Sequence, residues 1–336
     1  MAYDQYRPTS FKLLPPVVKN ILIISGLFYL ATIGLSSAFK IDLADILGMH
    51  YFAADKFQPY QLVTYMFMHG SFSHILFNMF AFWMFGYILE NVWGSKRFLI
   101  YFLITGLGAA LIQMLVFYFQ TEPVLNAISI YQQSPSVTSF KDFMESSNFK
   151  VVSYDIQNHV NAFQGKYNSM LMQADTLNQF ADVTMAHARE LQQQSLHLPQ
   201  IADSLRDQSQ LLTMQAESIR QSSDSLAAMN LRSTVDFMDQ YRADYLNAPL
   251  VVGASGAVFG ILLAFGMMFP NTLIYIYFLF PIKAKWVVII FGAIELFSGF
   301  TNLPGDNVAH FAHLGGMLFG FILIKYWNKH NRKTLF

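Results

Sequence analysis

Six stretches of the chain are apolar over nearly their whole length. They are residues 17–38, 71–89, 98–119, 251–270, 285–300 and 308–327. About 20 apolar residues in a helix cross the hydrocarbon core of a bilayer. Stop signals separate the stretches, such as Pro15-Pro16 before the first and Glu90-Asn91 after the second. The pattern predicts an all-α membrane protein with a bundle of six transmembrane helices.

Two further segments are apolar and aromatic but are not suited to spanning. Residues 39–68 mix charges with many aromatic side chains, and residues 273–281 form a short aromatic run. Amphipathic aromatic side chains settle at the membrane–water interface. We therefore expect both segments to lie on or in that interface.

Residues 121–247 are of a different kind. From Asn168 to Asn230 the segment is rich in Gln, Ser, Ala, Leu and Met, its apolar residues recur at helical spacing, and Pro199 interrupts them. This pattern predicts a long helical extramembrane insert between the third and fourth spans, with at least two amphipathic helices and a hairpin as the favoured pairing. The heptads are too loose to predict an oligomeric coiled coil. The segment contains no catalytic pattern, and its histidines are expected at its surface: His159, His187 and His197.

Composition supports the membrane class and divides the chain by charge. The sequence is 54% hydrophobic and only 12% charged, about half the usual charged fraction. The net charge of zero hides a split, because residues 121–247 carry 14 acidic and 8 basic residues out of 21 of each sign. The absence of cysteine excludes disulfide and thiol chemistry. The first apolar run begins late and no small-residue cleavage site follows it, so we interpret it as a retained span.

Basic residues orient the predicted spans. Lys and Arg cluster in four segments: Arg7, Lys12 and Lys19; Lys96 and Arg97; Lys283 and Lys285; Lys325, Lys329, Arg332 and Lys333. With six spans these segments all fall on one side, which the positive-inside rule makes cytoplasmic.

The predicted organisation has five parts. They are a cytoplasmic N-terminus (1–16), a membrane part with helices 1–3 and the outer loop 39–68 (17–120), an extracytoplasmic insert (121–247), a membrane part with helices 4–6 (248–327) and a basic cytoplasmic tail (328–336). We expect a multi-pass protein of a bacterial inner membrane with both termini in the cytoplasm.

Polar side chains inside the spans are candidates for function, because such groups are costly in lipid. His74 and Asn78 are four residues apart and share one face of the second span. The fourth span begins with a serine among small residues, Gly253-Ala254-Ser255-Gly256. Small residues let neighbouring helices approach closely and leave room around the hydroxyl.

Depth in the bilayer brings these groups together. At about 1.5 Å per residue, Ser255 lies roughly 22 Å from the cytoplasmic end of its span, His313 roughly 18 Å and His74 roughly 24 Å. Gly316 and Gly320 share the helical face of His313, so another helix can come close to its imidazole. A hydroxyl, two imidazoles and an amide are therefore expected at one level.

This set of groups fits acyl transfer. Ser255 becomes a nucleophile when neutral His313 takes its proton. The side chains of Asn78 and His74, with the Ser255 backbone N–H, would donate to the oxyanion. We find no acidic residue at that level to orient His313, and Glu90 is about 24 Å away. A Ser–His dyad is therefore favoured.

Each feature also has a structural interpretation. The small residues around Ser255 suit helix packing, and the sequence is not the Gly-x-Ser-x-Gly elbow of soluble hydrolases because residue 257 is Ala. His313 alone would serve as a hydrogen-bonding strut. Glu90, at a helix end, is interpreted as structural, and Glu295 is left open between a structural role and a polar path. The common depth favours the functional interpretation.

A metal centre is not expected. His310 and His313, with His69 and His74, would suggest one, but the sequence has no His-Glu-x-x-His and no supporting carboxylate for them. The predicted chemistry needs no metal and no other cofactor.

Three motifs resemble those of the rhomboid family of intramembrane serine proteases. His74-Ile75-Leu76-Phe77-Asn78 matches the family's His-x-x-x-Asn, and Gly253-Ala254-Ser255-Gly256 matches its Gly-x-Ser-Gly. Ala312-His313-x-x-Gly316-x-x-x-Gly320 matches its Ala-His-x-x-Gly-x-x-x-Gly. The resemblance covers about residues 55–120 and 248–327 and leaves the insert out.

The resemblance implies roles for these residues. Ser255 is the nucleophile, His313 is the general base, and His74, Asn78 and the Ser255 amide form the oxyanion hole. Phe259 takes a place where relatives often have Tyr, stacked on the catalytic histidine. Family members cleave transmembrane substrates near their outer ends, which reach the site through a lateral gate near spans two and five.

Three other comparisons with the family bear on the scaffold. Glu90 matches a glutamate taken as structural. Where many relatives carry Trp-Arg in the first outer loop, this chain has Tyr60-Gln61, which leaves the anchoring of that loop open. Relatives usually have a short link between spans three and four, whereas the insert stands there in this chain.

The sequence thus predicts a rhomboid-type serine protease that cleaves single-span or other transmembrane proteins near the outer face of the bilayer. Its partners are these substrates and membrane lipid, no feature points to nucleic acid, and the insert is a candidate for controlling substrate access or binding a further partner. The main alternative is a catalytically inactive rhomboid-like adaptor or sensor whose insert binds a partner. A small transporter is disfavoured because nothing suggests inverted repeats.

Overall fold

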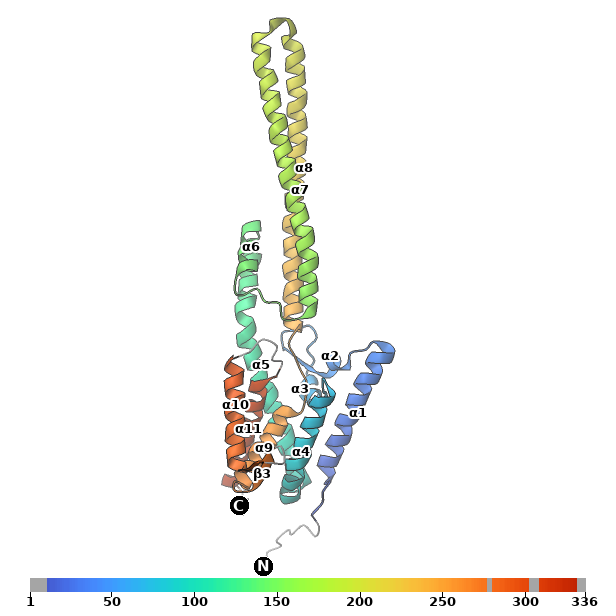
Figure 1. The fold of residues 1–336 in the computed structure, drawn as a ribbon, viewed down its shortest axis with the longest axis vertical. Coiled ribbons are helices and arrows are strands. Elements are labelled where there is room, and N and C mark those ends of the chain that lie inside the picture. Colours follow the sequence, from blue (N-terminus) through green and yellow to red (C-terminus); the bar gives the residue numbers. More distant parts are fainter. Residues whose placement is uncertain (1–10, 277–279, 302–307, 331–336) are drawn as a thin grey trace, which may run out of the picture. The chain divides into compact units, whose positions relative to one another are not determined.

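The computed structural model describes residues 11–276, 280–301 and 308–330 (Figure 1). Arg7, Arg332, Lys333 and the loop 302–307, which entered the predicted topology, lie outside the described residues. The chain divides into two compact units, one formed by Met1–Gln120 with Pro249–Phe336 and one by Thr121–Ala248. We describe each unit separately.

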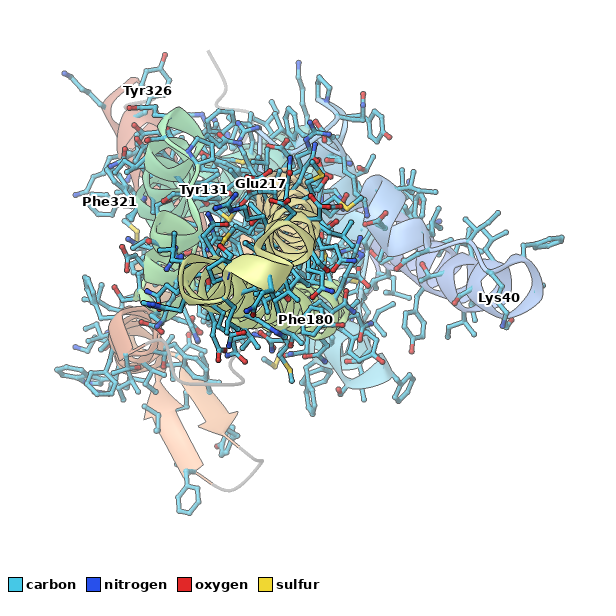
Figure 2. All side chains as sticks on the ribbon, turned by 90° about the horizontal axis from the view of Figure 1, so that it is seen from above. Lys40, Tyr131, Phe180, Glu217, Phe321 and Tyr326 are labelled. Atoms are coloured by element: carbon cyan, nitrogen blue, oxygen red, sulfur yellow. The ribbon has the colours of Figure 1, made fainter. Side chains whose placement is uncertain are left out.

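Long apolar helices make up the first unit. They are α1 (Pro16–Phe39), α4 (Phe72–Trp93), α5 (Ser95–Gln133, which continues into the second unit), α9 (Ser255–Met268), α10 (Ala284–Thr301) and α11 (His310–His330). Among the described residues, α1, α4, α5 and α10 are long and apolar enough to cross a membrane, whereas α9 has only 14 residues, about 21 Å of helix. Many of their apolar side chains face outward, as Phe321 and Tyr326 of α11 do in Figure 2. The predicted all-α class is confirmed.

Local sequence signals set several helix ends. Pro16 occupies the first turn of α1, where a missing N–H costs nothing. Ser71 caps α4 by accepting a hydrogen bond from the His74 N–H at 3.1 Å. Gly94 ends α4 at φ +80°, a conformation that favours glycine, and α5 begins at the next residue.

The helix that contains the third predicted span is longer than the span itself. The span was predicted to end at Phe119, close to the division between the two units after Gln120, and α5 continues beyond it to Gln133 through Pro123. An internal proline removes one helix hydrogen bond and usually kinks or ends a helix. Here the following turns are held by burial, because Val124, Ile128 and Tyr131 are at most 2% exposed in the core of the second unit. Tertiary packing therefore outweighs the local stop signal.

Two short antiparallel ribbons complete the first unit. β3 (Leu273–Ile276) pairs with β4 (Phe280–Lys283), within the segment predicted to be interfacial; residues 277–279 lie outside the described part of the chain. β1 (Met49–His50) pairs with β2 (Leu250–Val251), so that Met49 faces Val251. This second ribbon ties the loop 39–68 to the residues just before Ser255.

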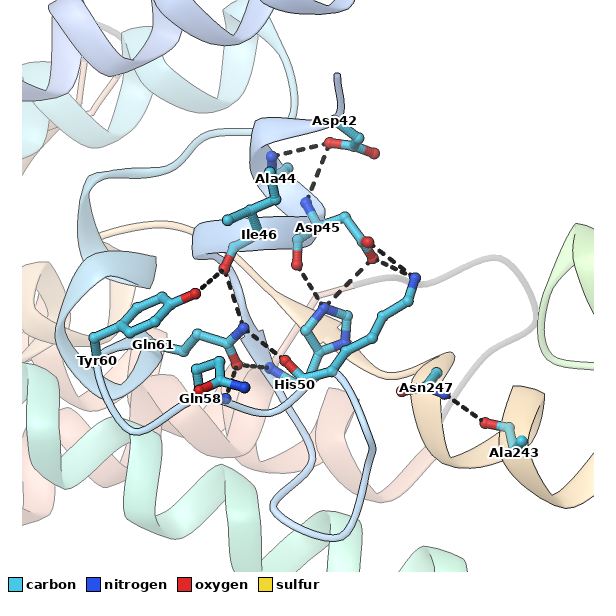
Figure 3. A network of polar contacts seen from close by, with 11 residues as sticks. Asp42, Ala44, Asp45, Ile46, His50, Gln58, Tyr60, Gln61, Ala243 and Asn247 are labelled. Carbon is cyan, nitrogen blue, oxygen red and sulfur yellow. Dashed lines mark hydrogen bonds and ion pairs between the residues drawn. The ribbon is translucent and has the colours of Figure 1, made fainter. Parts of the chain in front are cut away.

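The loop 39–68 is held together by one buried amide (Figure 3). Besides β1 it contains α2 (Leu43–Leu47), α3 (Gln61–Thr64) and a 3-10 turn, η1 (Tyr65–Phe67). Gln61 is 1% exposed, and its Oε1 accepts from the backbone N–H groups of His50 and Gln58. Its Nε2 donates to the carbonyls of Ile46 and Lys56 at 3.1 and 3.0 Å. The glutamine thus anchors the loop, which answers the question left open by Tyr60-Gln61.

A long helical hairpin forms most of the second unit. α7 (Tyr154–His197) and α8 (Ala202–Asn247) lie antiparallel along their length, joined at Leu198 and the 3-10 turn η2 (Pro199–Ile201), and a short helix, α6 (Val137–Glu145), accompanies them (Figure 1). The predicted hairpin and the break at Pro199 are confirmed. His159, His187 and His197 are exposed, as predicted.

The most deeply buried positions between α7 and α8 hold mainly small residues, and apolar residues of the predicted stripe lie half-buried beside them, among them Leu205, Leu212 and Ile219. Residues buried along the hairpin recur every seven positions: Ala174, Ala181, Ala188 and Ser195 on α7, and Ser209, Ala216, Ser223 and Asn230 on α8. Other large apolar side chains point outward, including Phe180 (Figure 2), Leu211 and Met214. Ser209 donates to the Ala188 carbonyl at 2.7 Å and Ser223 to that of Ala174 at 3.0 Å. The helices pack closely because small side chains permit it.

Removing the Gln61 amide should loosen the loop 39–68. Gln61→Leu leaves two backbone N–H groups, of which that of His50 is buried, and two carbonyls without their partner, which costs roughly 1–3 kcal/mol. We expect the melting temperature in detergent to fall by several degrees. The matched control is Gln58→Ala, which shortens an exposed side chain. Equal melting temperatures for Gln61→Leu and the wild type would contradict the anchoring role.

Enlarging a small residue in the hairpin should separate its helices. Ala181 is fully buried between α7 and α8, so Ala181→Leu should overpack the contact by about 1–3 kcal/mol. Ala186 on the same helix is exposed, and Ala186→Leu is the control. Thermal unfolding followed by circular dichroism at 222 nm should show a lower midpoint for the first variant only. A hairpin that tolerates both changes equally does not pack through these positions.

Candidate active site

Ser255 is the first residue of α9, and the backbone before it has an unusual shape. Gly253 has φ +119°, a conformation that L side chains rarely adopt, and its N–H donates to the Tyr65 carbonyl at 2.8 Å. The first N–H groups of a helix have no partner within the helix. The backbone N–H of Ser255 is therefore available as a hydrogen-bond donor on the same residue that carries the hydroxyl.

The side chains of α4 reach this backbone. A Cβ placed on Gly253 would lie 2.6 Å from His74 Nε2 and 3.3 Å from Asn78 Nδ2, so only glycine fits beside them. Asn78 is 8% exposed, and within the described residues its Nδ2 has no hydrogen-bond partner. A buried donor without a partner is uncommon and costly, and such a group is ready to bind a ligand oxygen. His74, Asn78 and the residues before Ser255 thus meet in space.

Glycines allow α9 and α11 to pack in close contact. A Cβ on Gly316 would lie 1.8 Å from the Gly256 carbonyl oxygen, and one on Gly260 would lie 3.0 Å from the Gly316 oxygen. Gly320 lies against Tyr101 of α5, whose hydroxyl donates to the Gly260 carbonyl at 2.8 Å. In lipid, where apolar burial offers little drive for association, such close contact is a main source of helix packing.

This packing places His313 over α9. The imidazole is 7% exposed and stacks on the Phe259 ring, with centroids 4.2 Å apart and planes 6° apart. Phe259 lies one turn after Ser255 on α9. The structure therefore brings His313 to the face of α9 that begins at the serine.

Glu295 of α10 contacts the same histidine. Its Oε2 lies 2.8 Å from His313 Nδ1 and 2.7 Å from His310 Nδ1. The statement that no acidic residue reaches the level of His313 was therefore wrong. Measured with the same helical rise, Glu295 is roughly 15 Å from Lys285, at the end of α10 that was predicted to be cytoplasmic. That depth is close to the one found for His313, so the signal was present in the sequence.

Glu295, His310 and His313 together also supply the carboxylate that the sequence analysis did not find for a metal site. One carboxylate oxygen of Glu295 and one ring nitrogen from each histidine all lie within 4.8 Å of one another. Donors sharing one tetrahedral zinc ion with bonds of about 2.0–2.1 Å would be about 3.3 Å apart. Separations of 2.7 and 2.8 Å between oxygen and nitrogen are those of charge-assisted hydrogen bonds. The cluster is described best as two imidazoles on one carboxylate.

His69 and Glu90 lie outside this group. His69 is 1% exposed, its ring lies 5.1 Å from that of His74, and burial, with His74 nearby, lowers its pKa to about 4. It is therefore neutral at physiological pH. Glu90, at the other end of α4, accepts from the N–H groups of Val17 and Val18 and from Ser95 Oγ at 2.6 Å. It joins the start of α1 to the first residue of α5.

A side chain at Gly316 should separate α9 from α11. Gly316→Val places a Cβ where the Gly256 carbonyl lies, and overpacking of this kind costs about 1–3 kcal/mol or more. The melting temperature in detergent should fall. Gly26→Ala on α1 is the control, because a Cβ there meets nothing within 4 Å. A Gly316→Val protein as stable as Gly26→Ala would exclude the close packing described above.

The comparisons with known proteins agree with this architecture. A family model of the Rhomboid domain matches residues 56–125 and 225–329, which together exceed half of the chain. Among curated proteins, none matches the chain significantly. Members of this family are integral membrane proteins, mostly intramembrane serine proteases, with inactive relatives among them. The matched segments contain α4, α9 and α11, and the chain belongs to the rhomboid family.

Proposed function

We propose that this protein is an intramembrane serine endopeptidase that cleaves transmembrane proteins near the outer face of the bilayer. Ser255 is the nucleophile and His313 the general base. The observation that carries the proposal is the meeting of three helices: His74 and Asn78 of α4 against Gly253, and His313 of α11 stacked on Phe259 of α9. Retention of all four polar residues argues against the inactive adaptor.

The reaction follows from these groups. His313 Nε2 takes the Ser255 Oγ proton as Oγ bonds to the substrate carbonyl carbon, and the carbonyl electron pair moves onto oxygen. The Asn78 amide, the His74 imidazole and the Ser255 N–H donate to that oxyanion. Breaking the C–N bond releases the amine with the proton from Nε2, and water then hydrolyses the acyl-enzyme by the same steps. No cofactor takes part.

The short α9 supports the position of the site. Six helices (α1, α4, α5, α9, α10 and α11) form the transmembrane bundle, with both termini in the cytoplasm of a bacterial cell. A helix of about 21 Å does not fill a hydrocarbon core of about 30 Å. Ser255, at the outer end of α9, thus lies below the membrane surface, where water enters from outside and substrates enter laterally between helices.

The second unit, Thr121–Ala248, faces outward in this topology and recruits, screens or caps substrates. Its position in the chain, directly before the segment that leads to Ser255, supports such a role. The main alternative from another class keeps the unit as a partner-binding sensor on an inactive core. The two are separated by whether the wild-type protein cleaves anything.

The catalytic proposal is tested by cleavage of a single-span substrate with purified protein in detergent. Ser255→Ala and His313→Ala should each lower the rate by about 10⁴-fold or more, to background. A fluorophosphonate probe should label Ser255 in the wild type and not in Ser255→Ala. Ser222→Ala, in an exposed part of α8, serves as the control. Cleavage that survives Ser255→Ala would refute this mechanism, and a wild type that neither cleaves nor labels would favour the adaptor.

The role of the second unit is tested by replacing about residues 125–244 with a short flexible linker. We expect altered cleavage of transmembrane substrates, while labelling of Ser255 by the small probe stays within about threefold. A panel of substrates all cleaved at the wild-type rate would remove the proposed role.

A further inference from the structure

Glu295 and His313 form a contact that the reaction as described above does not use. Glu295 is 8% exposed and His313 is 7% exposed, and Oε2 lies 2.8 Å from Nδ1. The angle at Nδ1 is poor for a hydrogen bond although the distance is that of one. The terminal torsion of a carboxylate is soft, so its oxygens can adjust to a donor at this distance. Ionisable side chains in such apolar surroundings are kept where they have a partner and a use.

Stacking on Phe259 leaves one property of the imidazole undetermined. It fixes the plane of the ring, with only 6° between the two rings. A ring turned over by 180° stacks equally well but exchanges the positions of its nitrogens and carbons. Only a partner at the ring edge selects the orientation, and the Glu295 carboxylate is such a partner.

The carboxylate also selects the tautomer. A carboxylate is only an acceptor, so the neutral imidazole beside it carries its proton on Nδ1 and leaves the lone pair on Nε2. That lone pair is what a general base for Ser255 needs. When His313 takes the serine proton it becomes cationic, and a carboxylate at this distance stabilises that cation strongly in a low-dielectric site.

His310 has a separate part in the cluster. Its Nδ1 forms a well-aligned hydrogen bond of 2.7 Å with the same Oε2 of Glu295. It comes from α11, three residues before His313, so it holds the carboxylate at the right height on that helix. Within the described part of the chain, the charged or titratable groups that face His313 are Glu295 from α10, His310 from α11 and His74 from α4.

We propose that Glu295 is a positioning residue for the proteolytic reaction: it orients His313 through Nδ1 and stabilises the imidazolium, which turns the Ser–His pair into a Ser–His–Glu triad. This inference rests on the proposed function. The Glu295 carboxylate stays ionised throughout the reaction. His310 holds Glu295 in place.

The test combines cleavage kinetics with labelling of Ser255 by a small probe, which does not depend on the entry of a transmembrane substrate between the helices. Glu295→Gln, Glu295→Asp and His310→Gln are compared with wild type, and Ser298→Ala on the same helix is the matched control. We expect Glu295→Gln to lower kcat by about 10²- to 10⁴-fold, with KM within about threefold. Fluorophosphonate labelling of Ser255 should slow by a similar factor. Glu295→Asp should recover at least about tenfold over Gln, and His310→Gln should lose less than Glu295→Gln.

A merely structural role gives a different result. If Glu295 only supports α10 or the entry of substrates, Glu295→Gln lowers the melting temperature or raises KM while Ser255 is labelled at the wild-type rate, and the proposal is overturned. Loss of wild-type cleavage in EDTA, restored by zinc alone, would make the cluster a metal site and also overturn it.

A spectroscopic measurement on the wild type covers the case in which Glu295→Gln does not fold. In ¹⁵N-histidine-labelled protein, His313 should show a proton on Nδ1 with a resonance far downfield, identified by its absence in His313→Ala. A neutral His313 protonated on Nε2 would refute the proposal. This result does not depend on proteolysis, so it stays distinct from a failure of the proposed function, which would appear as a wild type without cleavage or labelling.

Discussion

The contact of α9 with α11, backbone against backbone, is the constraint on which the site depends. The Gly256 carbonyl occupies the space that a side chain at Gly316 would need. In lipid the hydrophobic effect does not drive helices together, so their association depends on dispersion contacts. Close backbone approach supplies these contacts, and larger residues would prevent it. It also brings Phe259 and His313 into ring-on-ring contact. One packing requirement therefore holds the helices together and sets the plane of the imidazole.

A second constraint comes from outside the bundle. The loop 39–68 pairs β1 with β2, and the Tyr65 carbonyl binds the Gly253 N–H. These bonds determine how the chain enters α9, and the buried amide of Gln61 determines the shape of the loop that makes them. The left-handed turn at Gly253 is thus supported by a loop far away in sequence, and it faces the polar residues of α4. The geometry of the candidate site is thus built on several layers of ordinary hydrogen bonds.

Much of the architecture was predictable, and the misses have physical causes. The lengths of the apolar stretches predicted the helices. The predicted depths in the bilayer put His74, Asn78, Ser255 and His313 at one level before any contact was known. The continuation of α5 past Pro123 was not predictable from local signals, since it depends on burial of the turns that follow. The helical rise along α10 puts Glu295 at nearly the depth of His313, so this contact could have been suspected from the sequence. Its partner, the Nδ1 edge of His313, cannot be inferred from depth, because it depends on the rotation of α10 and α11 about their axes.

The packing of α7 against α8 has a consequence for how the second unit varies in length. The deeply buried positions, most of them held by small residues, recur at every seventh residue of both helices, and the two arms run in opposite directions. Removing two residues from one arm would put large side chains opposite small ones along the rest of the hairpin. Removing seven residues from each arm at matching heights would preserve every remaining pair. Insertions and deletions tolerated in this hairpin should therefore come in coordinated steps of seven, so its reach changes in increments of about 10 Å.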